Sequence, residues 1–263
     1  MDRWRGKWAL VTGASAGIGA ELARQLAASG ANLILSARRR DRLEHLATEL
    51  ARKHDVKVEV CIADLAKPSA PNEIFSFTEM KRLTVDLLIN NAGFGAYGEF
   101  HKIPLARQLE MVQVNITAAV HLTHLYLPQM IARRSGDILI VASTAAFQGV
   151  PYITTYAATK SFDLLFAEAL AEEVGGYGVR VCALCPGTTH TEFQKVAGQP
   201  DRHFRVAESA DKVARVGLEA LAKGKSYVIS GWWNYLQAHS ERLVPRRFVT
   251  RMAGLMFRPS AES

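Results

Sequence analysis

Short apolar runs alternate with segments of helical spacing along almost the whole chain, and no other feature limits its fold so narrowly. The runs at 8–12, 32–37, 56–62, 85–90, 137–143 and 179–185 are typical of buried strands, and 226–230 fits a seventh. Helical spacing fills the intervals, for example at 21–29 and 41–53. Because parallel strands need a crossover between them, we predict an α/β fold: a doubly wound, mainly parallel seven-stranded sheet with helices on both faces.

Length and composition favour one large domain. The chain has 263 residues, of which 49% are apolar and 22% charged, and no linker or repeat interrupts it. We assign residues 1–230 to a single domain and residues 231–263 to a basic, aromatic extension packed on the domain or at a surface. Residues 188–207, with Gly198 and Pro200, are predicted to form a mobile loop.

The net charge of +7 favours anionic partners. These include a phosphorylated cofactor, an acidic substrate or carrier, a nucleic acid and an anionic membrane. Arginines concentrate at 38–40 and near the end of the chain, where they are Arg242, Arg246, Arg247, Arg251 and Arg258. No nucleic-acid recognition motif accompanies them, so we do not expect a nucleic-acid partner.

The three cysteines, Cys61, Cys182 and Cys185, give no disulfide framework and favour a reducing, cytoplasmic compartment. Cys182 and Cys185 lie on a predicted strand, where positions three apart point to opposite faces, so we expect core packing and no metal site. The N-terminus enters a strand within a few residues and resembles no signal peptide. No apolar run approaches the ~18 residues of a transmembrane helix.

The segment "TGASAGIG" (12–19) follows the first strand and leads into a helix. Gly13 permits a tight turn, Gly17 lets the backbone approach a phosphate, and Gly19 allows close helix–strand packing. Such a loop after the first strand of a βαβ unit indicates a Rossmann-like dinucleotide site.

The end of the second strand indicates which dinucleotide is preferred. An acidic residue there would bind the ribose hydroxyls of NAD, but this chain has Ala37 and then Arg38. A guanidinium can bind a 2′-phosphate bidentately. We therefore predict NADP(H) in preference to NAD(H), and interpret Arg39 and Arg40 as the solvated start of a helix.

Taken together, several motifs resemble the compact single-domain short-chain dehydrogenases/reductases from about residue 6 to 230. They are "TGASAGIG", "DL" (64–65), "NNAG" (90–93), Asn115, Ser143, "YAATK" (156–160) and "PGTTHT" (186–191). The chain is similar in particular to bacterial 3-oxoacyl and 17β-hydroxysteroid reductases. The resemblance implies that cofactor contacts come from Gly13, Ser15, Gly17, Ile18, Gly19, Arg38, Asp64, Leu65, Asn91, Ala92, Gly93, Tyr156, Lys160, Pro186, Gly187, Thr189 and Thr191.

Tyr156 and Lys160 are four residues apart on a predicted helix, which places both on one face. A carbonyl that accepts a hydride needs a proton, and a free phenol with a pKa of ~10 exchanges protons poorly at neutral pH. A lysine ~5–6 Å away would stabilise the phenolate by about 3 kcal/mol, or roughly two pKa units. We expect Tyr156 to be the acid in reduction and the base in oxidation.

The resemblance gives roles to three further side chains. Lys160 would also hold the nicotinamide ribose, Ser143 would donate a hydrogen bond to the substrate oxygen, and Asn115 would position a water that returns a proton through Lys160. Taken singly, each also fits an ordinary structural position: a surface pair, a turn serine, a core asparagine.

The substrate is less constrained. Aromatic side chains expected above the nicotinamide favour an apolar carbonyl compound or its alcohol, although they could equally serve packing. They are Phe94, Tyr97, Phe100, Phe147, Tyr152 and Phe193.

The C-terminal extension differs from the short glycine-rich ending of acyl-carrier-protein reductases. This difference favours a homodimer over a tetramer. The family resemblance implies that helices around 105–132 and 155–174 form the dimer interface. Apolar residues alternate with arginines from Leu243 to Met256, so peripheral contact with an anionic membrane is one hypothesis. A lid over the substrate cleft and a subunit contact are the alternatives.

Competing functions on the same fold stay open. A non-catalytic, nucleotide-sensing protein would usually lack the tyrosine or lysine, which this chain retains. Epimerases and dehydratases would use the same pair but usually carry a larger C-terminal domain.

Overall fold

The computed structural model describes residues 2–200, 207–240 and 244–259. Its centre is a seven-stranded sheet in the order β3-β2-β1-β4-β5-β6-β9, in which every neighbouring pair is parallel. The strands are β1 (Trp8–Thr12), β2 (Asn32–Ala37), β3 (Val58–Ile62), β4 (Val85–Asn90), β5 (Gly136–Val141), β6 (Val179–Cys185) and β9 (Tyr227–Ile229). The predicted doubly wound sheet is confirmed, with ends that differ by up to two residues from the expected ranges.

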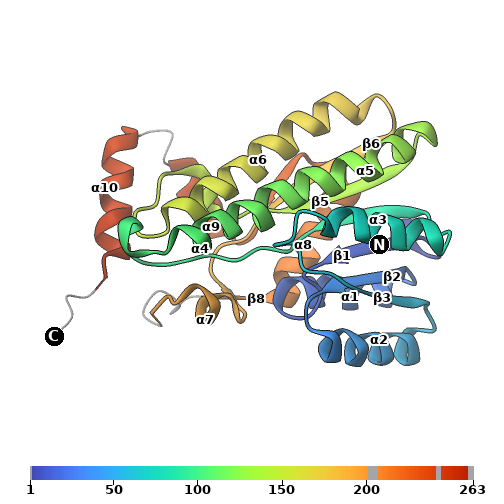
Figure 1. Cartoon of the computed structure of the whole chain (residues 1–263). Coiled ribbons are helices and arrows are strands. Elements are labelled where there is room, and N and C mark those ends of the chain that lie inside the picture. Colours follow the sequence, from blue (N-terminus) through green and yellow to red (C-terminus); the bar gives the residue numbers. More distant parts are fainter. Residues whose placement is uncertain (1, 201–206, 241–243, 260–263) are drawn as a thin grey trace.

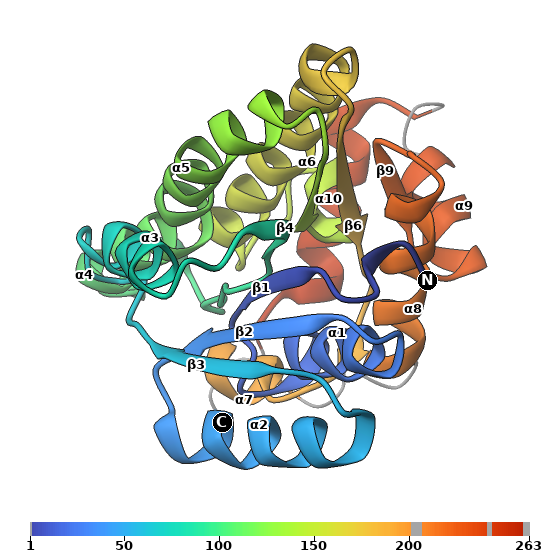
Figure 2. The ribbon, with the colours of Figure 1, turned by 90° about the vertical axis from the view of Figure 1, so that its right-hand side faces the viewer.

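Helices cover both faces of the sheet (Figures 1 and 2). One face carries α3 (Ala70–Met80), α4 (Leu105–Val112), α5 (Ala118–Ala132) and α6 (Thr154–Gly175). The other carries α1 (Gly17–Ala28), α2 (Arg40–His54) and α8 (Ala210–Ala222).

The alternation of side chains along each strand divides the core into two layers. Leu10, Leu88 and Ile138 pack under the face of α3, α5 and α6, whereas their neighbours Val11 and Leu139 pack against α1 and α8. The two strand cysteines follow the same rule: Cys185 belongs to the first layer and Cys182 to the second. All three cysteines are free and buried, as the strand periodicity predicts.

The first residues are held to the sheet through one buried carboxylate. Asp137, at the start of β5, accepts hydrogen bonds from Trp4 Nε1 at 2.7 Å and from Arg3 Nε at 3.1 Å. Arg180 of β6 donates to the same carboxylate from Nε at 2.8 Å. The carboxylate therefore joins the N-terminal turn η1 (Asp2–Trp4) to two central strands.

The segment after β6 is more structured than a loop. It contains β7 (Thr189–His190), α7 (Phe193–Ala197) and β8 (Glu208–Ser209), and β7 pairs in parallel with β8. The expected loop over 188–207 therefore contains regular structure at Thr189–His190 and Phe193–Ala197, and its mobility stays a prediction. Residues 201–206 of that range lie outside the described residues.

The C-terminal extension forms α9 (Trp232–Ser240) and α10 (Arg246–Phe257). Arg242 and Leu243 lie outside the described residues. The inner side of α10 packs on the segment before α6, with Ala253 buried against Val150, Ile153 and Ala157. Figure 1 shows α7 and α10 on the same side of the molecule.

Candidate active site

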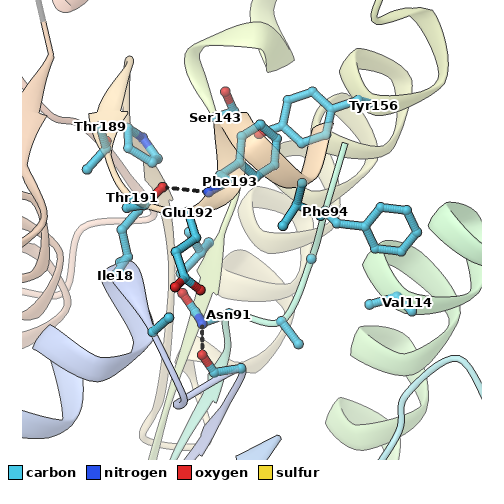
Figure 3. Close-up of a pocket in the computed structure, with 18 of the residues that line it drawn as sticks. Ile18, Asn91, Phe94, Val114, Ser143, Tyr156, Thr189, Thr191, Glu192 and Phe193 are labelled. Atoms are coloured by element: carbon cyan, nitrogen blue, oxygen red, sulfur yellow. Dashed lines mark hydrogen bonds between the residues drawn. The ribbon is translucent and has the colours of Figure 1, made fainter. Parts of the chain in front are cut away.

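A cavity of about 430 Å³ opens where the strand order reverses between β1 and β4. Its walls come from the loops after the central strands, from α6 and α7, and from the end of α10. Figure 3 shows Ile18 and Asn91 on one part of the wall and Ser143 and Tyr156 on another. The topology therefore brings the glycine loop and the YAATK helix, about 140 positions apart, into one pocket.

The glycine loop has the shape of a phosphate cradle. Gly13 has a positive φ of 66°, and a Cβ there would lie 2.8 Å from Asn91 Nδ2 and 2.9 Å from Ala92 Cα. A Cβ on Gly19 would lie 2.5 Å from Gly13 O. No side chain caps the start of α1, where Ala16 is the N-cap, so its first N–H groups face the cavity without a side-chain acceptor. An anionic diphosphate fits these donors.

The opposite side of this loop is held by β1 and β4. Thr12 Oγ1 donates to Ile89 O at 3.0 Å and accepts from the backbone N–H of Ala92 at 3.1 Å. Asn91 Nδ2 donates to Thr12 O at 2.8 Å. Asn91, Ala92 and Gly93 consequently line the cavity, as do Asp64 and Leu65 after β3.

The two arginines after β2 have different partners. Arg38 Nη1 lies 4.0 Å from both Asp64 Oδ1 and Glu110 Oε1 and is largely exposed. Arg39 donates from Nη2 to Ser15 Oγ at 3.0 Å and from Nη1 to Glu192 Oε2 at 2.7 Å. Arg39 is exposed and is the N-cap of α2, as expected for a solvated helix start, and it also contacts the glycine loop through Ser15.

Glu192 joins α7 to this arginine cluster. Besides Arg39, it accepts a hydrogen bond from Arg42 Nη1 at 2.6 Å. The hydrogen bonds from Arg39 and Arg42 lower the pKa of Glu192 to about 2, so the carboxylate stays ionised at any ordinary pH. Arg38 and Arg39 therefore both lie beside carboxylates at the rim of the cavity.

Ser143, Tyr156 and Lys160 all line the cavity. Ser143 caps the short helix η4 (Thr144–Phe147), and its Oγ accepts from Ala145 N at 3.1 Å. Lys160 Nζ lies 6.0 Å from the centre of the Tyr156 ring. It also donates to Val141 O at 2.7 Å and to Asp163 Oδ2 at 2.9 Å.

This environment does not lower the pKa of Tyr156 as we expected. Burial raises the pKa of Tyr156 above that of a free phenol, and Lys160 with a hydrogen bond from Ser143 offsets only part of that effect. The negative charge of Asp163 acts in the same direction as burial. The electrostatic prediction was wrong because it omitted burial and the carboxylate beside Lys160.

Asn115 lies in a π-helical turn, Gln113–Thr117, between α4 and α5. Its Oδ1 accepts from Phe94 N at 3.1 Å, and its Nδ2 donates to Phe94 O and to Thr159 Oγ1, both at 3.0 Å. The buried amide thus ties the loop after β4 to the residue before Lys160. Asn115 does not itself line the cavity, and the water-positioning role stays a prediction.

The loop after β6 supplies the remaining expected contacts, since Pro186, Gly187, Thr189 and Thr191 all line the cavity. Thr144 N donates to Pro186 O at 2.9 Å, so this loop is fixed beside η4. Gly187 lies against α9: a Cβ there would be 2.3 Å from Asn234 Nδ2.

The aromatic lining differs from the expected set. Phe94 and Phe193 line the cavity, and the Phe193 ring lies 5.0 Å from that of Tyr156 (Figure 3). Phe147 instead packs near Tyr227, and Phe100 is exposed. Phe257 of α10 lines the cavity, and its carbonyl accepts from Tyr97 Oη at 2.9 Å.

Sequence reasoning missed three side chains at or beneath this site. Arg39 could have been found as the neighbour of Arg38, and Asp163 by its three-residue spacing from Lys160 on one helix. No local signal indicates Phe257, because it reaches the cavity from a separate helix.

The described residues provide neither a metal-binding cluster nor a membrane-spanning helix. They contain no group of three or more His, Cys, Asp or Glu side chains arranged to hold a metal ion. None of their helices combines the length and apolarity needed to cross a bilayer.

Comparison with known proteins agrees with this geometry. The short chain dehydrogenase family matches residues 7–202. The chain is 32% identical over 245 residues to a very-long-chain 3-oxoacyl-CoA reductase of Pyrenophora tritici-repentis, covering 89% of this chain and 70% of that protein. It is 31% identical to an uncharacterized oxidoreductase of Myxococcus xanthus, covering 90% and 92%.

Solved structures give the same relationship. A short-chain dehydrogenase from Sphingobium yanoikuyae in complex with NADPH superposes with a TM-score of 0.83 at 27% identity, covering 98% of both chains. A 7beta-hydroxysteroid dehydrogenase superposes with a TM-score of 0.87 at 27% identity, covering 95% of this chain and 98% of that one. The chain therefore belongs to the short-chain dehydrogenase family and is an oxidoreductase.

Proposed function

We propose that this protein reduces a carbonyl group to a secondary alcohol with NADPH, or catalyses the reverse oxidation. One observation carries the proposal: Ser143, Tyr156 and Lys160 line the same cavity as the glycine loop. A hydroxyl donor, a proton donor and a cation beside a phosphate cradle are the groups that hydride transfer to a carbonyl requires.

Each side chain has a distinct proposed task. The bound dinucleotide supplies the hydride that forms the new C–H bond. The hydroxyl of Tyr156 gives its proton to the carbonyl oxygen as the C=O π bond breaks, and Ser143 donates a hydrogen bond to that oxygen. Lys160 has three N–H donors and uses two, on Val141 O and Asp163, which leaves one for a ribose hydroxyl of the cofactor.

The preference for NADP(H) over NAD(H) rests on the arginines after β2. Arg38 and Arg39 both line the cavity, and the strand ends in Ala37, so it has no terminal carboxylate that would repel a 2′-phosphate. The NADPH complex of the Sphingobium yanoikuyae relative supports the same choice. Arg39, which already contacts Ser15, is the stronger candidate for the 2′-phosphate.

An apolar carbonyl substrate, of 3-oxoacyl or similar type, is the proposed substrate class. The cavity beyond Tyr156 is bounded by Phe94, Ile153, Phe193 and Phe257, which offer an acyl or aromatic substituent a dry surface. The reductase names of the fungal relatives are consistent with this class.

Two surfaces complete the proposal. Leu105 and Leu109 on α4 and Leu165 on α6 are exposed on adjoining helices, and we propose that a second copy of the chain covers them. The outer side of α10 is proposed to contact anionic lipid. Its sequence carries arginines and no acidic residue, so its charge is complementary to such a surface. The proposed location is cytoplasmic, with peripheral contact at the membrane.

The substitution Tyr156→Phe tests the reaction. We expect it to lower kcat/KM for ketone reduction by about 10²–10⁴-fold, because the proton donor is lost. A panel of 3-oxoacyl thioesters, steroid ketones and aromatic ketones, followed by nicotinamide absorbance, measures it. NADPH binding, followed by fluorescence titration, should change little because the phosphate cradle is unaltered.

Tyr177→Phe is the matched control, since Tyr177 is exposed beyond the end of α6. Retention of turnover by Tyr156→Phe would contradict the assignment. Binding of NADPH without turnover of any compound in the panel would instead favour a nucleotide-sensing protein.

A further inference from the structure

The candidate catalytic lysine has a buried anionic partner. Asp163 lies one helical turn after Lys160 on α6, and the two side chains form an ion pair at 2.9 Å. Their side chains are 2% and 6% exposed, respectively, so water screens the pair weakly. Among the described atoms, Asp163 Oδ1 has no hydrogen-bond partner, so Lys160 alone balances this carboxylate.

The pair presents Tyr156 with a different field from that of a lone lysine. Burial disfavours the Lys160 ammonium, but Asp163, with smaller contributions from Tyr156 and Cys185, outweighs burial and raises the pKa of Lys160, so the lysine stays charged. Burial also raises the pKa of the Asp163 carboxyl, and Lys160 offsets part of that effect. A cation and an anion in contact form a dipole, whose attraction for a phenolate is weaker than that of the cation alone.

Among the described residues, Lys160 and Asp163 are the charged groups that act on Tyr156, and Glu168 acts only on the neighbouring Cys185. From β6, Cys185 faces Lys160, and burial raises the pKa of its thiol so that it stays neutral. From the loop after β5, Ser143 offers Tyr156 a hydroxyl, and from the end of β5, Val141 offers Lys160 a carbonyl. From α7, Phe193 covers the Tyr156 ring with an apolar surface. Asp163 is therefore the group that sets how much of the lysine charge Tyr156 experiences.

We propose that Asp163 is a positioning residue that partly neutralises Lys160 and thereby keeps the Tyr156 hydroxyl protonated, in the form that donates to a carbonyl oxygen. The inference rests on the proposed role of Tyr156 and adds to it a preferred direction, carbonyl reduction. It also assigns a purpose to a buried carboxylate that hydride transfer itself does not require.

The sign of the effect follows from the charges. When the negative charge of Asp163 is removed, the Tyr156 phenolate itself still favours the Lys160 ammonium. The ammonium then attracts the phenolate without an opposing carboxylate, so the pKa of Tyr156 falls. Reduction needs the phenol and is lost as pH rises through this pKa, so its alkaline limb moves to lower pH. Oxidation needs the phenolate, so its acid limb moves the same way.

The test is Asp163→Asn in the full chain, because the amide can still accept a hydrogen bond from Lys160 but carries no charge. The ultraviolet absorbance of phenolate is titrated against pH for Asp163→Asn and for the unaltered chain. Tyr156→Phe in each background isolates the contribution of Tyr156. We expect the Tyr156 transition to move down by about one pH unit. This measurement needs no substrate, so it stands even if no carbonyl compound is turned over.

Activity supplies a second readout. The pH profiles of kcat/KM are measured with a 3-oxoacyl thioester for reduction and with its alcohol for oxidation. The alkaline limb of reduction and the acid limb of oxidation should both move to lower pH. At pH values below its acid limb, alcohol oxidation should become up to about 10-fold faster. Asp163→Glu retains the charge and should keep both limbs near their original positions. Glu173→Gln, which removes an exposed carboxylate from the same helix, should move neither.

A Tyr156 transition that stays in place or moves upward in Asp163→Asn overturns the proposal, as does a loss of thermal stability with unmoved limbs. If Asp163→Asn does not fold, Asp163→Ser, which leaves room for a water, replaces it. Titration of Tyr156 in the unaltered chain is an independent test. Its Tyr156 should ionise at or above the pH of a free phenol, about 10, and ionisation well below that pH also overturns the proposal.

Discussion

Arg38 and Arg39 leave β2 as adjacent residues, yet the fold gives them separate surroundings. Arg38 extends toward Asp64 and Glu110, whereas Arg39 contacts the glycine loop through Ser15. A guanidinium already fixed beside a phosphate cradle loses little side-chain entropy when it binds a 2′-phosphate. Cofactor choice should therefore depend more on Arg39 than on Arg38.

We predict that Arg39→Ala lowers kcat/KM for NADPH by about 10- to 100-fold and leaves NADH little changed, because a charge-assisted contact to the 2′-phosphate is lost. Steady-state kinetics with both cofactors measures the ratio. Arg40→Ala is the matched control, since Arg40 pairs with Glu44 at the surface. An equal loss with both cofactors would show that Arg39 supports the loop and does not read the phosphate.

Helix α10 has one side packed on the domain and one side exposed. Ala253 and Phe257 face the domain and Phe257 lines the cavity, while Phe248, Met252 and Leu255 are exposed. Removing the helix would disturb the active site together with any membrane contact. Substitutions on its outer side separate the two effects.

We predict that the double substitution Arg247→Glu and Arg251→Glu lowers partitioning onto phosphatidylglycerol vesicles by at least about 10-fold, since each arginine near such a surface contributes about 1 kcal/mol. Vesicle co-sedimentation measures the partition, and ketone reduction should persist. Arg52→Glu on α2 makes the same kind of charge change at another exposed position. If the double variant binds vesicles as the unaltered chain does, α10 is not the lipid contact.

At the scale of the whole molecule, the largest question is what covers α4 and α6. Leu109 and Leu165 are 58% and 66% exposed, although both belong to helices that pack directly on the core. Apolar side chains gathered on neighbouring helices are typical of a subunit interface.

We predict that Leu109→Glu combined with Leu165→Glu converts the proposed dimer to a monomer, because two carboxylates on each subunit would be buried without partners. Sedimentation velocity measures the change in mass. Met80→Glu, at an exposed apolar position on α3, should leave assembly unaltered. A dimer that survives the double substitution would place the interface elsewhere.

The division of the chain into a single domain (residues 1–230) and a C-terminal extension (residues 231–263) also stays a prediction.

Much of the architecture could be predicted because it follows from local pattern. The nearly continuous burial of β5 and β6 and the positive φ of Gly13 depend on residues close together in the chain. The same is true of the shared helical face of Tyr156 and Lys160, and such short-range features fixed the sheet, the cradle and the candidate catalytic pair in advance.

Only the tertiary structure decided what those residues meet. It brought Arg39 to Ser15 and Glu192, placed Phe257 in the cavity wall, and gave Asp137 partners more than 40 positions away in sequence. It also buried Tyr156 itself, which, with a smaller contribution from the Asp163 carboxylate beside Lys160, reversed the expected direction of the Tyr156 pKa shift. Periodicity shows which face a side chain occupies, but the degree of burial and the distant charges that set its pKa depend on how separate elements pack.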